Sequence, residues 1–156
     1  MPLLNWALEQ VRIKECKMQV TGKCHCEAIS FQAEVDPGRA VLCHCTDCRV
    51  MSGAPYRSII QTRDTDFKLL SGQPKMYYKY GDSGNRREVA FCDTCGSHLY
   101  ATSVGDEPNR FFGLRTGILD QCEDLKPTLQ VWCRSEVPWA QDVSQIQRVD
   151  KVPTAR

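Results

Sequence analysis

Cys43-His44-Cys45-Thr46-Asp47-Cys48 places three cysteines within six residues. A buried free cysteine behaves as a small hydrophobic side chain, and packing in a core does not explain three of them within six residues. A disulfide between Cys43 and Cys45 would be strained, because the Cα atoms of a bridge lie roughly 4.4–6.8 Å apart with converging Cβ vectors. A soft divalent metal, by contrast, requires thiolates that converge on one point. The C-x-C-x-x-C spacing therefore predicts a metal site.

The role of this cysteine trio follows from its ligand count. Three ligands leave one position of a tetrahedral metal open, which is what distinguishes catalytic zinc from structural zinc. We therefore interpret Cys43, Cys45 and Cys48 as a catalytic metal site. The alternative is a second structural site with a fourth ligand from elsewhere, for which the candidates are His25, His44 and His98. His44 lies between two cysteines and would point away from a metal that both of them hold.

Four further cysteines form two short motifs, Cys24-x-Cys26 and Cys92-x-x-Cys95. Gly96 follows the second motif and accepts a positive φ, which lets backbone N–H groups turn toward the sulfurs. The long separation of the motifs suits two hairpin loops that meet at one end of a sheet. The spacing predicts a structural four-cysteine zinc site. Iron is the main alternative metal, because four thiolates also suit iron–sulfur chemistry.

Length and composition restrict the class of protein. A chain of 156 residues predicts a single domain, and chains of this size bury about 68–70% of their unfolded surface. Lys and Arg number 20 against 19 Asp and Glu, without runs of like charge, so nucleic acid and anionic membranes are not expected partners. We find neither an apolar run of membrane-spanning length nor a secretory signal. The ten cysteines are then expected to be reduced thiols and metal ligands in a cytoplasmic protein.

The hydrophobic pattern predicts an all-β, sheet-packed or barrel-like domain. In the clearest strand, Ile29, Phe31, Ala33 and Val35 alternate with polar residues. A short helical turn is expected after Cys48, as far as residue 52. Further strands are expected at 56–61, 67–70, 76–80, 88–91, 98–102, 111–115 and 129–133, separated by Gly and Pro turns.

The predicted β domain covers residues 20–143, with additions at both ends. Residues 1–19 are expected to be an N-terminal extension in which Leu4, Leu8 and Val11 share one face of a short helix. Residues 144–156 are expected to be a polar C-terminal tail. Among the remaining thiols, Cys133 is expected in the core because its strand is apolar, whereas Cys16 and Cys122 receive no role.

Residues beside the trio are candidates for binding a substrate. Arginine guanidinium groups suit carboxylates, and five arginines lie in or near the segments around the trio: Arg49, Arg57, Arg63, Arg86 and Arg87. Arg49 and Arg57 are the preferred candidates because they flank the cysteine loop. Tyr56 is a third candidate. The alternatives are a solvated surface charge for each arginine and core packing for the tyrosine.

Taken together, the motifs resemble a known family. The sequence resembles the glutathione-dependent formaldehyde-activating enzymes, a family that includes centromere protein V-like proteins. The resemblance covers roughly residues 20–140 and rests on Gly22-x-Cys24-x-Cys26, Cys43-His44-Cys45-x-x-Cys48-Arg49-x-x-Ser52-Gly53-Ala54-Pro55, Phe91-Cys92-x-x-Cys95-Gly96-Ser97, Gly117-Ile118-Leu119-Asp120 and Pro138-Trp139. Two positions depart from the family pattern: Glu27 replaces a glycine and Gln130 replaces a histidine.

The resemblance implies a mainly β, zinc-bearing, Mss4-like β-tent in a single domain. It also implies two zinc ions per chain, a structural one on Cys24, Cys26, Cys92 and Cys95 and a catalytic one on Cys43, Cys45 and Cys48. The activity that names the family is condensation of glutathione with formaldehyde to S-hydroxymethylglutathione. We therefore expect a zinc-dependent carbon–sulfur lyase-type enzyme whose partners are a small thiol, such as glutathione, and a small aldehyde. The alternative is a non-catalytic, zinc-stabilised module that presents its loops to a protein partner.

Overall fold

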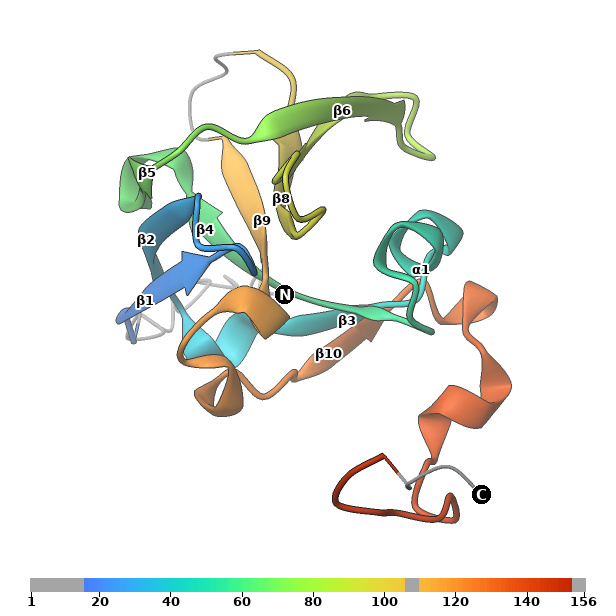
Figure 1. The fold of residues 1–156 in the computed structure, drawn as a ribbon. Coiled ribbons are helices and arrows are strands. Elements are labelled where there is room, and N and C mark those ends of the chain that lie inside the picture. The colour runs from blue at the N-terminus through green and yellow to red at the C-terminus, as the bar shows by residue number, and fades with distance from the viewer. Residues whose placement is uncertain (1–15, 106–109, 153–156) are drawn as a thin grey trace, which may run out of the picture.

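The computed structural model describes residues 16–105 and 110–152, which form a mainly β domain with two sheets (Figure 1). The fold class predicted from the sequence is confirmed. The smaller sheet has the order β1-β2-β5, with β1 at Met18–Lys23, β2 at Ser30–Val35 and β5 at Phe67–Ser71.

The larger sheet has seven strands in the order β10-β3-β4-β9-β8-β7-β6. Its strands are β3 (Val41–Cys43), β4 (Arg57–Arg63), β6 (Lys75–Tyr80), β7 (Arg86–Phe91), β8 (His98–Ser103), β9 (Phe111–Arg115) and β10 (Leu129–Val131). In this sheet, β10 and β3 are parallel, and all the other neighbouring strands are antiparallel.

Helical segments of the described chain are short. The α-helix α1 (Thr46–Ser52) connects β3 to β4. The 3₁₀ turns are η1 (Pro37–Arg39), η2 (Asp64–Asp66), η3 (Thr116–Ile118), η4 (Cys122–Asp124), η5 (Cys133–Ser135) and η6 (Pro138–Gln141). Within residues 16–105 and 110–152, every helix is too short or too polar to cross a lipid bilayer.

The two faces of the larger sheet have different surroundings. Strand residues alternate between faces, and Ile60, Ala90, Phe112 and Leu114 belong to the buried core that includes Phe31 of the smaller sheet. The odd-numbered residues of the same strands, such as Ile59 and Gly113, point to the opposite face, where they line a cavity. One face therefore holds the fold together and leaves the other free to form a site.

Four aromatic rings connect the two sheets. Phe67, at the start of β5, stacks on Phe112 of β9 with ring centroids 4.8 Å apart, and it also contacts Phe31 at 5.3 Å. Tyr100 of β8 packs edge-on against Phe112 at 4.9 Å. Aromatic pairs at these distances stabilise more than their buried area alone would.

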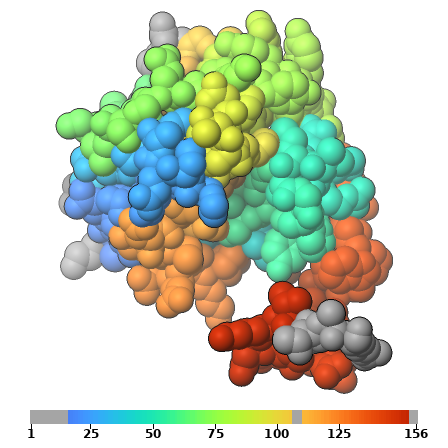
Figure 2. Space-filling view, in the orientation of Figure 1, coloured from blue at the N-terminus to red at the C-terminus, as the bar shows by residue number. Residues whose placement is uncertain are grey.

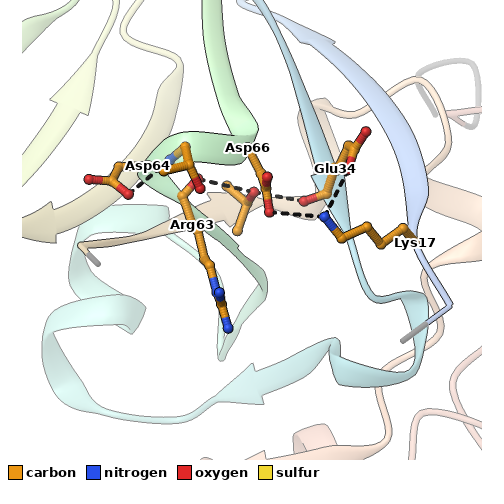
Figure 3. Close-up of polar contacts among 7 residues, drawn as sticks. Lys17, Glu34, Arg63, Asp64 and Asp66 are labelled. Atoms are coloured by element: carbon orange, nitrogen blue, oxygen red, sulfur yellow. Dashed lines mark hydrogen bonds and ion pairs between the residues drawn. The ribbon is translucent and has the colours of Figure 1, made fainter. Parts of the chain in front are cut away.

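Polar contacts join the edge of the smaller sheet to the turn after β4 (Figure 3). Lys17 Nζ lies 3.1 Å from a carboxylate oxygen of Glu34 and 3.5 Å from one of Asp66. Because half of the Lys17 side chain is exposed, these ion pairs contribute little stability. They nevertheless connect the residue before β1 to β2 and η2.

The structure corrects the prediction for the last strand. The strand expected at 129–133 ends at Val131, because Trp132 takes a left-handed conformation with φ of 61° and a 3₁₀ turn follows. Cys133 is consequently exposed, and its predicted place in the core is wrong. The helix predicted around Leu4–Val11 lies outside the described residues. Residues 142–152 are exposed and carry neither helix nor strand.

Candidate metal centres and the adjoining cavity

Two hairpin loops bring the four predicted structural ligands together. Cys24 and Cys26 lie in the β1–β2 loop, Cys92 and Cys95 lie in the β7–β8 loop, and the four sulfurs all lie within 4.8 Å of one another. In Figure 2 the blue segment that contains the first loop lies against the yellow segment that contains the second. The Sγ–Sγ distances are 3.6 Å for Cys24–Cys26 and 3.7 Å for Cys26–Cys92. Tetrahedral zinc with bonds of about 2.3 Å spaces its sulfurs by about 3.8 Å, so the cluster fits zinc.

Backbone groups hold these loops in place. The N–H of Ile29 donates to Cys24 Sγ over 3.3 Å, and the N–H of Gly96 donates to the carbonyl of Cys92 over 2.8 Å. Ser97 Oγ accepts from the N–H of His25 at 3.0 Å and lies 3.2 Å from Cys95 Sγ, so it joins the two loops. Gly96 has a φ of 74°, as predicted from its place after the second motif.

Glu27 occupies a strained position beside this cluster. Its φ is 64°, a left-handed conformation that favours glycine, and its carboxylate forms an exposed ion pair with Lys23. A residue with a Cβ atom is disfavoured in this left-handed region by contact with its own backbone. The departure noted in the sequence is therefore a local strain that the closed loop tolerates.

We expect Glu27→Gly to melt about 2–4 °C above Glu27→Ala in the metal-loaded protein, because only glycine removes the left-handed strain. Both variants lose the ion pair with Lys23, so their difference isolates the backbone. Differential scanning calorimetry of the two variants provides the measurement. Equal melting temperatures would show that the loop carries no strain at this residue.

The three-cysteine cluster lies where β3 ends and α1 begins. Cys43 is the last residue of β3, Cys45 is the N-cap of α1, and Cys48 lies in its first turn. The N–H of Cys48 donates to Cys45 Sγ over 3.3 Å. The three sulfurs lie within 4.8 Å of one another, and in the described part of the chain no histidine, carboxylate or further cysteine joins them. The predicted helical turn thus starts at Thr46, inside the motif, and helps to position its sulfurs.

The three thiols of the trio influence one another's ionisation. A hydrogen bond from Cys48 lowers the pKa of the Cys43 thiol to about 5, and the same contact, together with burial, raises the pKa of Cys48. Ionisation of one thiol therefore opposes ionisation of its neighbour. A divalent metal held by these three residues would remove that opposition and favour the thiolate form of all three sulfurs. The donor set, three cysteine sulfurs, suits zinc.

His44 belongs to the neighbouring strand rather than to the trio. It is 2% exposed, its Nε2 lies 2.7 Å from Oε1 of Gln130, and its ring packs edge-on against Tyr56. Gln130, noted in the sequence as a departure from the pattern that the chain resembles, is thus the direct partner of His44. The prediction that His44 does not join the metal of its flanking cysteines agrees with this geometry. A ring nitrogen of His44 instead lies within 4.8 Å of ligand atoms of Cys133 and Glu136.

A cavity of about 670 Å³ opens beside the trio, on the non-core face of the larger sheet. This volume is within the usual range for small-molecule sites. A row of cross-strand neighbours forms its floor: Gln61, Gly113, Ala101 and Val89. The two central residues, Gly113 and Ala101, have small side chains and therefore leave space above the middle of the floor. At Gly113 an added Cβ would lie 3.2 Å from a methyl group of Ile59, so even alanine would narrow the cavity.

The walls of the cavity come from segments far apart in the sequence. Met51 of α1, Lys79 of β6, the 81–83 turn, Trp132 and Ser135 all line it. Both carboxylates that line the cavity have partners: Asp47 pairs with Lys79, and Asp82 pairs with Arg134 at 3.1 Å. These two ion pairs connect the β6–β7 hairpin to α1 and to the segment after β10.

Two buried arginines lie close to the trio, and a third arginine, Arg87, lines the same cavity from β7. Arg57 is directly opposite Cys43 in the β3–β4 pair, and Arg115 is opposite Ile59 in the β4–β9 pair. Arg57 and Arg115 are 5% and 7% exposed, and each has a buried nitrogen without a hydrogen-bond partner. Burial, followed by repulsion from Arg57, lowers the pKa of Arg115 to about 9, while Cys48 and Cys43 oppose this shift. Burial likewise lowers the pKa of Arg87.

The structure places the predicted substrate residues outside the cavity lining. Arg49 Nη1 donates to the carbonyl of Ser135 over 3.5 Å, and Tyr56 packs on His44. Arg57 lies opposite Cys43 in the β3–β4 pair but does not line the cavity. The arginines that do line it are Arg87 and Arg115. Arg87 was one of the five arginines considered from the sequence but was not preferred, and Arg115 was not considered.

Comparison with known proteins agrees with these cysteine clusters. Residues 19–135 match the sequence profile described as glutathione-dependent formaldehyde-activating enzyme. The chain belongs to this family. The matched region contains all seven cysteines of both clusters and ends at the residue that completes the cavity wall.

Structural comparison finds the same fold in a crystal structure of a Rhodobacter sphaeroides protein. It has a TM-score of 0.55 and 22% sequence identity, and the match covers 70% of this chain and 98% of that protein. At this identity the likeness shows the fold alone. No curated protein sequence shows significant similarity to the chain.

Proposed function

We propose that this protein is a zinc-dependent carbon–sulfur lyase-type enzyme that forms and cleaves a thiol–aldehyde adduct, with S-hydroxymethylglutathione as the adduct that the family suggests. One observation carries the proposal: three cysteine sulfurs converge beside a cavity of small-molecule size, and no fourth ligand from the described residues completes the cluster. A purely structural zinc site would have its fourth ligand from the protein.

The proposed metals have separate tasks. Cys24, Cys26, Cys92 and Cys95 would hold a structural zinc that joins two hairpin loops. Cys43, Cys45 and Cys48 would hold the catalytic zinc. Zinc bound there would supply a positive charge that favours the thiolate form of an incoming thiol, whose pKa is otherwise about 8.5.

Addition of a thiol to an aldehyde mainly requires that the two reactants be held in contact in the correct orientation. The thiol sulfur bonds to the aldehyde carbon, the carbonyl π electrons move to oxygen, and the thiol proton ends on that oxygen to give the hydroxymethyl thioether. The reverse reaction breaks the carbon–sulfur bond. Arg57 and Arg115 lie near the trio and stabilise negative charge on sulfur, while Gly113 and Ala101 leave room above the floor. Holding two reactants in contact supplies much of the acceleration in such a reaction.

An exchange experiment tests the proposal. We expect the zinc-loaded protein to accelerate interconversion of formaldehyde, glutathione and S-hydroxymethylglutathione by about 10²-fold or more over the same buffer without protein, as seen in NMR exchange spectra. Bovine serum albumin at an equal thiol concentration serves as the control for non-specific thiol chemistry. If the loaded protein fails to accelerate exchange for this adduct and for related aldehydes, the lyase proposal is wrong and the non-catalytic zinc module is favoured.

A further inference from the structure

The imidazole of His44 has one nitrogen that the described residues leave without a partner. Its Nε2 lies 2.7 Å from Oε1 of Gln130, and because an amide oxygen can only accept, Nε2 carries the hydrogen and donates it. Nδ1 therefore holds a lone pair, and it is buried without a hydrogen-bond partner. The side chain is 2% exposed, so an unsatisfied acceptor there is costly. A histidine that donates through one nitrogen and leaves the other bare has the arrangement of a metal ligand.

A thiol and a carboxylate lie beside this ring. A ring nitrogen of His44, the sulfur of Cys133 and a carboxylate oxygen of Glu136 all lie within 4.8 Å of one another. Tetrahedral zinc with bonds of about 2.0–2.3 Å spaces nitrogen, sulfur and oxygen ligands by about 3.5 Å. Cys133 is exposed, so its side chain can rotate to close the remaining distance, and a metal ion can enter from solvent.

The backbone brings these three residues together without a metal. The N–H of His44 donates to the carbonyl of Val131 over 3.0 Å, and the left-handed Trp132 then turns the chain into η5. Within that turn, the N–H of Glu136 donates to the carbonyl of Cys133 over 3.1 Å. Side chains three residues apart in a 3₁₀ turn project from the same side, so both can face the imidazole.

The charges of this cluster suit a divalent cation. A thiolate and a carboxylate carry two negative charges, and a neutral imidazole adds none. The ion pairs of the described residues do not include Glu136, whose Oε1 instead accepts a hydrogen bond from Nε2 of Gln141. The ligands would therefore neutralise Zn²⁺, an ion for which nitrogen, sulfur and oxygen are all suitable donors.

The cluster is separate from the cavity and from the seven cysteines described above. Among the described residues that line the cavity, none is a member of the cluster, although Trp132 and Ser135 of the same turn are. The segment after β10 lies beside α1 (Figure 1), where Arg49 Nη1 is 3.5 Å from the carbonyl oxygen of Ser135. An ion bound to the cluster would tie this wall of the cavity to the connection between β3 and α1.

We propose that His44, Cys133 and Glu136 form a third metal site, which binds a zinc ion through Nδ1, a thiolate and a carboxylate, with water in the remaining position. Binding releases the thiol proton of Cys133 to solvent. Gln130 is a positioning residue, because it holds the imidazole in the tautomer that leaves Nδ1 bare. The site does not depend on the proposed function, since it shares no ligand with the trio.

Zinc uptake at controlled concentrations of free zinc tests the site. We expect Cys133→Ser and Glu136→Gln each to bind one zinc ion per chain fewer than wild type, in equilibrium dialysis of the folded protein under reducing conditions followed by metal analysis. The difference between variant and wild type is the readout, so the outcome is the same whether or not the trio keeps its own zinc. Gln130→Leu is expected to weaken binding of that ion by about 10- to 100-fold, because it removes the acceptor that orients His44.

Cys122→Ser and Glu123→Gln are the matched controls. Cys122 begins η4 as Cys133 begins η5, and both thiols are exposed. Neither Cys122 nor Glu123 belongs to a cluster of metal-ligand side chains in the described part of the chain, so both controls are expected to bind as much zinc as wild type. Equal uptake by Cys133→Ser and wild type would overturn the proposal. Loss of an ion from Cys122→Ser as well would also overturn it, because exposed thiols in general would then account for the binding.

Hydrogen exchange gives a second reading that does not count ions. The amide of Glu136 lies in the turn between two of the ligands, so zinc at about 100 times its Kd is expected to slow exchange of this amide by about 100-fold in wild type. Cys133→Ser is expected to abolish the slowing, and the amide of Asp124, in the matching turn η4, is expected to be indifferent to zinc. Exchange at Glu136 that zinc leaves unchanged in wild type would contradict the site.

Discussion

Cys95→Ser is expected to lose one zinc ion per chain and to unfold the domain, with a melting temperature lower by about 20 °C or more. Serine has nearly the volume of cysteine, so packing changes little, but the four-cysteine cluster loses a ligand. This cluster joins the β1–β2 and β7–β8 loops, and the free energy of binding a structural metal is folding free energy. Zinc analysis by mass spectrometry and thermal melting by circular dichroism provide the measurements.

Cys122→Ser is the matched control for this prediction. Cys122 is exposed in η4 and belongs to neither cysteine cluster, so its replacement is expected to keep both metals and the wild-type melting temperature. If Cys95→Ser melts like this control, the core between the two sheets suffices without the metal, and the assignment of a structural role to the four cysteines is wrong.

Cys45→Ser is expected to give the opposite result: a folded protein that lacks the second zinc and loses about 10²-fold or more of its exchange activity. The trio occupies the non-core face of the sheet, so its metal joins no separate parts of the core. Serine is the suitable replacement, because Cys45 is the N-cap of α1 and serine is a strong N-cap. The helix start therefore survives while a soft metal ligand is lost.

The readouts for Cys45→Ser are the zinc content, the melting temperature and the NMR exchange rate of the same preparation. Melting is expected to stay within a few degrees of wild type. Unfolding of Cys45→Ser, or zinc content equal to wild type, would contradict the division of the seven cysteines into a structural four and a catalytic three.

The sequence predicted which cysteines lie together because each of the three motifs that contribute them is local in the sequence. Cys43, Cys45 and Cys48 fall within six residues, and a loop that short has few ways to separate its sulfurs. The meeting of Cys24 with Cys92 depends on two hairpins, and the strand pattern with its turns was sufficient to place them. The all-β class followed from the same alternation of polar and apolar residues.

Tertiary placement limited what the sequence could show. The apolar run Val131-Trp132-Cys133 predicted a strand, but the left-handed backbone at Trp132 ends β10 and turns Cys133 outward. No residue pattern signals that conformation for a tryptophan. In β9, by contrast, Gly113 and Arg115 alternate with the buried Phe112 and Leu114, a pattern that marks them as sharing the non-core face.

The sequence did not single out the two arginines of the cavity, because both are distant from the trio along the chain: Arg87 was considered without being preferred, and Arg115 was not considered. Arg49 and Arg57 were chosen for their proximity in sequence, whereas Arg87 and Arg115 reach the cavity through the strand order β4-β9-β8-β7. Along the chain the last three of these strands come in the order β7, β8, β9, but across the sheet from β4 they come in the opposite order. The sheet topology therefore puts Arg87 and Arg115 in one cavity with the trio, and sequence spacing alone does not predict this.

The parallel pairing of β10 with β3 has a consequence for the biosynthesis of the protein. The four-cysteine loops are complete once Cys95 has left the ribosome, so that centre can close on a partial chain. The N–H of His44 bonds to the carbonyl of Val131, and its ring bonds to Gln130, 86 residues later. The three-cysteine cluster therefore lacks its neighbouring strand until most of the chain has been translated, and we infer that the four-cysteine cluster can form before the surroundings of the trio are complete.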